Sequence, residues 1–229
     1  MPEAFPDLVF DSPSADVLAA DSALWQLYDS AFPSTEREPR SVILETLRRG
    51  DGVAVRARHD SNSVGLALAH MLRHPPVLFV VYLAVDQKLR SHHIGTTLFE
   101  KLWTTGMERY AERKQSLTGM LWEVDIPERA TSQQGLQQSR RRIAFFARLG
   151  GQILPVRYFQ PPVDGITPVP MHLMFRPAPG RSLPDVSAYS ALVRALYFEK
   201  YHEANKIPQP VLEELLQKTG AEENLSSRE

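Results

Sequence analysis

A short basic turn between an apolar strand and an amphipathic helix is the clearest candidate for chemistry in this sequence. The stretch from Leu78 to Trp103 reads LFVVYLAVDQKLRSHHIGTTLFEKLW, with Arg90 and Gly95 in the turn. A strand that leads through such a turn into a helix directs free backbone N–H groups and the positive end of the helix outward. The pattern therefore predicts an anion site, with pyrophosphate as its usual occupant. An ordinary strand–helix crossover with a basic turn is the alternative.

Two carboxylates form a second candidate site in the segment 120–126, which reads MLWEVDI. Alternation along a strand places Glu123 and Asp125 on one face, opposite the apolar side chain of Trp122. Carboxylates among apolar neighbours are costly to bury without a role. We therefore predict a functional pair, and a solvated face or an ion pair with an arginine of 140–142 is the alternative.

The elements that must position these two sites follow the order β–α–α–β–β–β–α–β–α–β–β. The hydrophobic pattern predicts strands at 4–10, 52–59, 64–73, 78–85, 120–126, 152–160 and 171–176, and helices at 15–31, 40–49, 94–113 and 132–149. After a linker rich in Pro and Gly, two more helices are predicted at about 185–205 and ending near residue 218. We expect one α/β domain at 1–177 and a helical extension with a polar tail at 178–229. The apolar face of the extension is expected to pack on that domain rather than on a second subunit.

The turn resembles motif A of the GNAT acyltransferase superfamily, which binds acetyl-CoA through the pattern Arg/Gln-x-x-Gly-x-Gly/Ala. The matching residues are Arg90-Ser91-His92-His93-Ile94-Gly95, preceded by the strand Tyr82-Leu83-Ala84-Val85-Asp86 and followed by an apolar helix. The predicted element order over residues 5–177 is also the GNAT order. The resemblance therefore implies the GNAT fold, a mixed central β-sheet with flanking helices.

The resemblance also implies a function and a set of site residues. The backbone of Leu83, Ala84 and Val85 would pair with the pantetheine arm of acetyl-CoA, the co-substrate. The backbone N–H groups of Arg90, Ser91, His92, His93, Ile94, Gly95 and Thr96 would hold the pyrophosphate. In the family layout the segment MLWEVDI lines the acceptor cleft, so Glu123 would act as general base through water. Asp125 would help to attract a cationic amine.

Two positions depart from the family pattern. His93 stands where the first glycine of the motif normally lies, although histidine tolerates left-handed backbone angles better than most residues. His93 is either an exposed turn residue or, when protonated, a contact for phosphate. Phe146 occupies the place of a tyrosine that, in many GNAT enzymes, protonates the departing thiolate. Tyr82 and Tyr158 are the candidate substitutes, and each is alternatively a packed aromatic residue.

The composition sets further limits on function. The 229 residues carry a formal net charge of −1, which argues against bulk attraction to nucleic acid or to an anionic membrane. The sequence contains no cysteine, so a thiol nucleophile, an acyl-cysteine intermediate and a zinc–thiolate site are excluded. We find no metal-ligand spacing, no signal peptide and no apolar run long enough to span a membrane. We therefore expect a cytoplasmic monomer or homodimer.

The sequence supports two principal hypotheses of function. The first is an N-acetyltransferase in which a small primary amine attacks acetyl-CoA directly. The second is a GNAT-fold module that binds acyl-CoA with little or no catalysis and serves as a sensor or assembly component. Glu123, Asp125 and the basic turn favour the enzyme, whereas His93 and Phe146 favour the binding module. A structural domain that does not bind CoA is a third, weaker interpretation.

Overall fold

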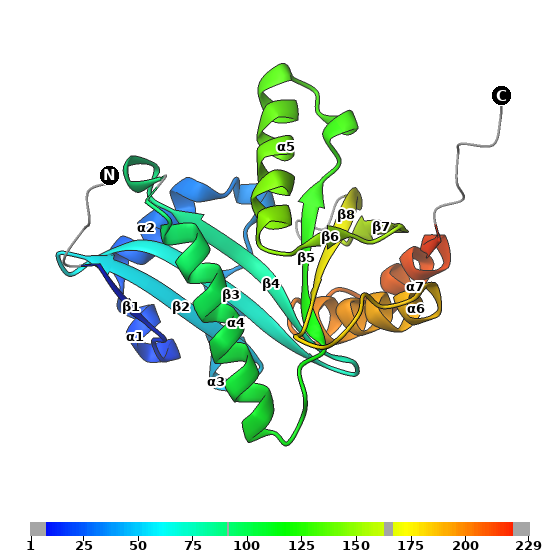
Figure 1. Cartoon of the computed structure of the whole chain (residues 1–229), viewed down its shortest axis with the longest axis horizontal. Helices are drawn as coiled ribbons and strands as arrows, with labels where there is room; N and C mark the ends of the chain where they lie inside the picture. Colours follow the sequence, from blue (N-terminus) through cyan, green and yellow to red (C-terminus); the bar gives the residue numbers. More distant parts are fainter. Residues whose placement is uncertain (1–7, 91, 163–166, 222–229) are drawn as a thin grey trace. The chain divides into compact units, whose positions relative to one another are not determined.

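The computed structural model describes residues 8–90, 92–162 and 167–221, and they form two compact units (Figure 1). The first unit comprises Met1–Met71 and Leu78–Leu117, and the second comprises Leu72–Val77 and Thr118–Glu229. Residue 177, where we predicted a domain boundary, belongs to the second unit, and the predicted division into a domain and an extension stays a prediction. None of the helices in the described residues is long and apolar enough to cross a membrane.

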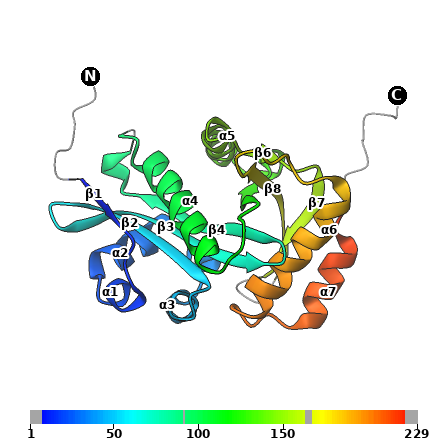
Figure 2. The same cartoon turned by 60° about the horizontal axis from the view of Figure 1, so that its bottom comes forward.

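The first unit combines four neighbouring strands with four α-helices. Its strands, in spatial order, are β1 (Val9–Asp11), β2 (Gly52–His59), β3 (Asn62–Arg73) and β4 (Pro76–Val85), of which the end of β3 from Leu72 and the start of β4 up to Val77 belong to the second unit. Its α-helices are α1 (Ala15–Ala19), α2 (Ser22–Ala31), α3 (Arg40–Arg48) and α4 (Ile94–Glu112). Short 3₁₀ turns lie at Ser34–Glu36 and Gln87–Leu89. Figure 2 shows α1, α2 and α3 on one face of β2–β4 and α4 on the opposite face.

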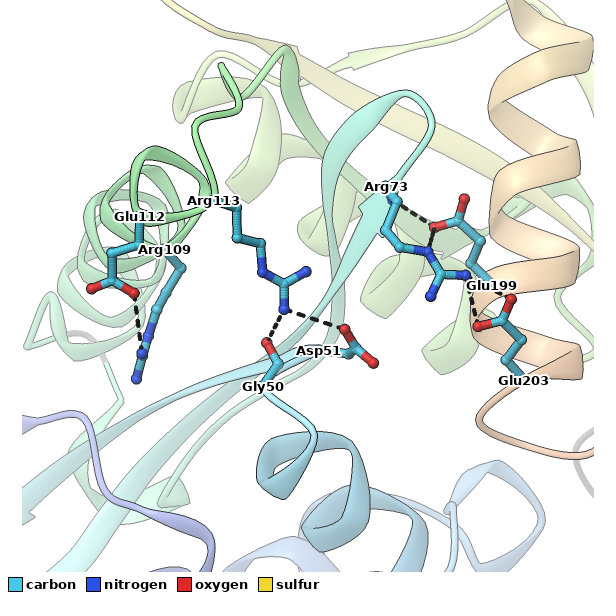
Figure 3. A network of polar contacts seen from close by, with 8 residues as sticks. All are labelled: Gly50, Asp51, Arg73, Arg109, Glu112, Arg113, Glu199 and Glu203. Atoms are coloured by element: carbon cyan, nitrogen blue, oxygen red, sulfur yellow. Dashed lines mark hydrogen bonds and ion pairs between the residues drawn. The ribbon is translucent and has the colours of Figure 1, made fainter.

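Helix α4 is held closely against the strands beneath it. A Cβ atom on Gly65 of β3 would lie 2.8 Å from Leu98 Cδ1, and one on Gly106 of α4 would lie 2.5 Å from Leu78 Cδ2. A side chain at either position would force the leucine side chain to move, so these glycines allow the helix and the strands to lie close together. Beyond the helix, Arg113 donates to the carbonyl oxygen of Gly50 at 2.6 Å, which ties the chain to the turn after α3 (Figure 3). The position of the α4 N-terminus is therefore fixed by packing along the whole helix.

The second unit is built on a set of antiparallel strand pairs. β5 (Gly119–Asp125) pairs with β8 (Val169–Pro177), β8 pairs with β6 (Gln152–Ile153) and β7 (Val156–Gln160), and β7 pairs with β9 (Gly220–Ala221). The helices are α5 (Gln133–Arg148), α6 (Val186–Ala195) and α7 (Gln209–Lys218), with a 3₁₀ turn at Pro127–Arg129 and a π-helix, η4, at Leu196–His202. α6 and α7 lie side by side in both views of the unit.

The structure differs from the predicted elements at several places. The strand predicted at 4–10 is observed as β1 at Val9–Asp11, and residues 4–7 lie outside the described residues. The helix predicted at 15–31 is divided into α1 and α2, because Asp21 caps the second helix by accepting a hydrogen bond from the Leu24 N–H at 2.9 Å. The strand predicted at 152–160 is divided into β6 and β7 around Pro155, which has no N–H to donate to a ladder. The long C-terminal helix begins as α6 and continues as the π-helix η4.

Candidate active site

The turn after β4 is ordered by hydrogen bonds from Asp86. Its backbone N–H donates to the carbonyl oxygen of Val64 at 2.9 Å, and its carboxylate accepts from the Lys88 N–H at 2.9 Å. Arg90 follows and is exposed. Ser91, which we assigned to the pyrophosphate site, lies outside the described residues. The chain then reaches His93 and enters α4, as the sequence pattern predicted.

His93 adopts the left-handed conformation that a glycine would take at this position. Its φ and ψ angles are 60° and 7°, and it is the residue that precedes the first turn of α4. Its side chain is exposed and makes no capping hydrogen bond, while its carbonyl oxygen accepts from the Thr97 N–H at 2.9 Å. His93 therefore has backbone angles that a glycine at this position could also adopt.

The first turn of α4 offers backbone donors and no competing acid. The N–H groups of Ile94, Gly95 and Thr96 belong to the part of a helix that has no partner within the helix. No acidic residue lies in this turn, so no side chain of the turn itself neutralises the positive end of this 19-residue helix. Ile94 is buried and anchors the turn, whereas Gly95 and Thr96 are half-buried. This arrangement suits a diphosphate.

Replacement of His93 separates the role of the backbone from that of the imidazole ring. We expect His93→Gly to retain CoA affinity, because glycine adopts left-handed angles without strain. The stability should change by no more than about 1 kcal/mol, since relief of strain is offset by a more flexible unfolded chain. Calorimetric titration with CoA at pH 6 and pH 8 measures the first quantity, and denaturant unfolding measures the second.

The matched control for that variant is His93→Val. A β-branched residue is a true outlier at positive φ, so this variant should lower both stability and CoA affinity. Strong loss of CoA affinity in His93→Gly at pH 6 alone would show instead that the protonated imidazole contacts phosphate.

The end of β4 carries the residues that we assigned to the pantetheine arm. Ala84 is buried, whereas Leu83 and Val85 are half-buried, which fits the alternation of a strand. Their backbone pairing with a ligand stays a prediction.

Tyr82 is hydrogen-bonded to the segment that connects α2 and α3. Its hydroxyl donates to the carbonyl oxygen of Glu36 at 3.0 Å and accepts from the N–H of Glu38 at 2.8 Å. Its ring packs edge-on against Tyr28 and Phe32, with centroid distances of 5.0 and 4.7 Å. Burial, followed by the nearby charge of Glu38, raises the pKa of the Tyr82 hydroxyl far above its usual value. These contacts favour the interpretation of Tyr82 as a packed structural residue, and its role as an acid stays a prediction.

Glu123 of β5 is half-buried and is held by three donors from two other elements. Its Oε1 accepts from the hydroxyls of Tyr158 and Tyr201, the latter at 2.7 Å, and its Oε2 accepts from Gln160 Nε2 at 2.7 Å. Tyr158 and Gln160 lie on β7, and Tyr201 lies on η4. Burial, followed by the charge of Glu123, raises the pKa of the Tyr158 hydroxyl well above its usual value, so that side chain stays a donor. Tyr158 thus contacts the carboxylate directly.

Asp125 has a different environment, although it is only two residues away. Its Oδ2 lies 2.9 Å from Arg142 Nη1, and both side chains are about half exposed, at 50% and 51%. An ion pair with this arginine run is the alternative that the sequence left open for the two carboxylates. The pair is exposed and is worth about 0–1 kcal/mol, so a substrate cation could compete with Arg142 for Asp125.

Phe146 of α5 is buried against β5. Its ring lies 4.8 Å from that of Trp122 and 5.1 Å from that of Phe145. A Cβ atom on Gly151 would lie 2.5 Å from Trp122 Cζ2, so the turn after α5 also packs closely on this tryptophan. Phe146 is therefore a packing residue, and its equivalence to the family's tyrosine stays a prediction.

The sequence-predicted residues thus divide into two groups. The turn residues and Tyr82 lie in the first unit, whereas Glu123 and Asp125 lie in the second. Sequence reasoning missed two partners of Glu123, namely Gln160 and Tyr201. The available signal for Tyr201 was that Tyr197 and Tyr201 lie four residues apart, on the apolar face of the C-terminal extension.

Comparison with known proteins identifies a family model. The model of the GNAT acetyltransferase family matches residues 22–132, which include β2–β5, the basic turn and α4. No curated protein sequence shows significant similarity to this chain.

Three solved structures show the same fold at low sequence identity. A GNAT-family protein from Bacteroides thetaiotaomicron has a TM-score of 0.61 and 20% identity, covering 83% of this chain and 96% of its own. Naa50 of Arabidopsis thaliana, in complex with the bisubstrate analogue CoA-Ac-MVNAL, has a TM-score of 0.53 and 15% identity, covering 75% and 99%. A GNAT acetyltransferase from Elizabethkingia anophelis with acetyl-CoA bound has a TM-score of 0.50 and 14% identity, covering 76% and 99%. The predicted α/β fold, a mixed sheet with flanking helices, is confirmed.

Proposed function

We propose that this chain, in which residues 22–132 match the model of the GNAT acetyltransferase family, is a GNAT enzyme that transfers the acetyl group of acetyl-CoA to a small primary amine. The observation that carries the proposal is the N-terminus of α4, which follows a left-handed residue and carries no acid in its first turn. Acetyl-CoA is bound in one of the similar structures, and a CoA analogue in another. The backbone from Arg90 to Thr96 would hold the pyrophosphate, and that of Leu83 to Val85 the pantetheine arm.

The proposed reaction is a direct attack of a neutral amine on the thioester. The amine nitrogen forms a bond to the carbonyl carbon, the carbon–sulfur bond breaks, and its electron pair leaves on sulfur. The amine gives up its proton to Glu123 through a water molecule. A thiol with a pKa of about 8.5 is a tolerable leaving group near neutral pH. Phe146 therefore does not rule out turnover, although loss of a general acid costs about 10²- to 10⁴-fold.

A second candidate function is an acyl-CoA-binding module without efficient catalysis. Two observations favour it: Phe146 has no hydroxyl to protonate the thiolate, and the Glu123 carboxylate already accepts three hydrogen bonds. Both candidates require the same nucleotide site. They differ in whether free CoA is released in the presence of an amine.

Binding of CoA and acetyl-CoA is expected to raise the thermal stability of the protein. Ligand at 100 times its dissociation constant adds about 2.7 kcal/mol to the free energy of unfolding, because only the folded chain presents the site. Differential scanning fluorimetry with and without each ligand measures the shift. No shift with either ligand, together with no heat of binding, would contradict both candidate functions.

Release of thiol separates the two candidates. The protein contains no cysteine, so a thiol reagent detects only free CoA. We expect release to depend on an added amine, and a panel of amino sugars, polyamines and amino-acid amines would identify the acceptor. Saturable binding without amine-dependent release would instead establish the binding module.

A further inference from the structure

The C-terminal extension contributes a side chain to the Glu123 cluster. Tyr201, on η4, is buried at 2% exposure, and its hydroxyl donates to Glu123 Oε1 at 2.7 Å. The two residues lie 78 positions apart in the sequence. This contact joins a segment outside the family match, which ends at residue 132, to the residue that we propose as the base.

Two further hydrogen bonds fix the π-helix that carries Tyr201. Tyr197, four residues earlier, donates its hydroxyl to the carbonyl oxygen of Phe159 at 2.7 Å and so fastens η4 to β7. Glu199 Oε2 accepts from the backbone N–H of Arg73 at 2.5 Å. Tyr201 is therefore held on a helix that is tied to the rest of its unit at both β7 and the β3–β4 connection.

An ion pair strengthens the second of these attachments. Arg73 Nη2 donates to both carboxylate oxygens of Glu203, at 2.6 and 2.7 Å. Figure 3 shows Glu199 and Glu203 pointing from the helix toward Arg73. Both contacts belong to the second unit, so they hold the extension against the same body as Glu123.

We propose that Tyr201 is a positioning residue of the active site, which holds the Glu123 carboxylate in the orientation and charge state that proton transfer requires. The proposal rests on the proposed function, because it gives Glu123 the role of base. A hydroxyl that donates to a carboxylate stabilises the ionised form. The C-terminal extension is then part of the catalytic machinery.

The other groups around the carboxylate define what a test must control. From β7, Tyr158 and Gln160 donate to it. From η4, Tyr197 lies close enough for the charge of Glu123 to contribute to the raised pKa of its hydroxyl, although burial is the larger cause. Lys200 is buried beside Tyr201 on that helix. From β8, the residue that pairs with Glu123 is the apolar Leu173.

The test compares Tyr201→Phe with Tyr197→Phe in the full chain. Each variant removes one buried hydroxyl from the same helix, but only the first removes a donor to Glu123. The pH dependence of kcat/KM is measured for amine-dependent CoA release. Tyr201→Phe should shift the acidic limb of the kcat/KM profile to higher pH by about one unit, which lowers kcat/KM about tenfold at low pH. The reason is that a carboxylate without this donor binds its proton more tightly.

Tyr197→Phe should leave the acidic limb unchanged, and Glu123→Gln should abolish that limb in either background. An unchanged profile in Tyr201→Phe would overturn the positioning role while leaving the acetyltransferase intact. The same shift in both tyrosine variants would also overturn it, because loosening of the helix would then be the cause. If the wild-type protein releases no CoA with any amine, the proposed function fails, and the positioning role fails with it.

Discussion

A Gly95→Glu variant is expected to lose CoA binding by a factor of about 100 or more, which corresponds to about 2.7 kcal/mol. The substitution places a carboxylate in the first turn of α4, where the proposed pyrophosphate would be held. Attraction between the helix end and the ligand is then replaced by repulsion between like charges. The variant should still fold, because Gly95 is only half-buried and acidic side chains are stabilising in the first turn of a helix.

The matched control is Met107→Glu on the same helix. Met107 is 38% exposed and lies 12 residues beyond Gly95, about 18 Å along the axis at 1.5 Å per residue. The Met107→Glu variant adds the same charge to α4 but far from the helix N-terminus, so calorimetry should show nearly unchanged CoA affinity. Equal loss of affinity in both variants would indicate a general charge effect and would argue against a nucleotide site at the helix N-terminus. Circular dichroism of both variants checks that the helix is retained.

The basic turn could be predicted from sequence because it is a local structure. Strand, turn and helix are continuous from β4 to α4, and each leaves its own pattern of apolar and polar residues. Even the left-handed His93 was accessible to this reasoning, because a family glycine at that position implies a positive φ. By contrast, we did not predict that the helix at 15–31 is divided in two. This division depends on the Asp21 side chain, which caps α2.

The environment of Glu123 could not be predicted in the same way. Alternation along β5 correctly separated Glu123 from Trp122, but the donors to its carboxylate come from residues 35, 37 and 78 positions away. Their approach depends on the pairing of β7 with β8 and on the π-helix η4, and neither has a distinctive local pattern. Tyr197 and Tyr201 of the extension contact Phe159 and Glu123 inside the second unit, and packing of the extension's apolar face on the preceding domain rather than on a second subunit stays a prediction.

A Glu123→Gln variant is expected to lower kcat by about 10²-fold or more while leaving the affinity for acetyl-CoA unchanged. The amide keeps the shape of the side chain but cannot take a proton from the amine. The structure indicates that the cluster can accommodate it, because the hydroxyls of Tyr158 and Tyr201 can accept as well as donate hydrogen bonds. Steady-state kinetics across the pH range and calorimetry with acetyl-CoA measure the two quantities.

Asp125→Asn is the matched comparison, because it makes the same chemical change two residues away on β5. Its carboxylate is half exposed and paired with Arg142, so its expected contribution is attraction of a cationic acceptor rather than proton transfer. An attraction of this kind stabilises the bound amine and the transition state equally. Its loss in Asp125→Asn should therefore raise the KM of the amine and leave kcat nearly unaltered. If Glu123→Gln keeps full activity at every pH, the carboxylate serves only to join β5, β7 and η4. The base must then be solvent or another side chain.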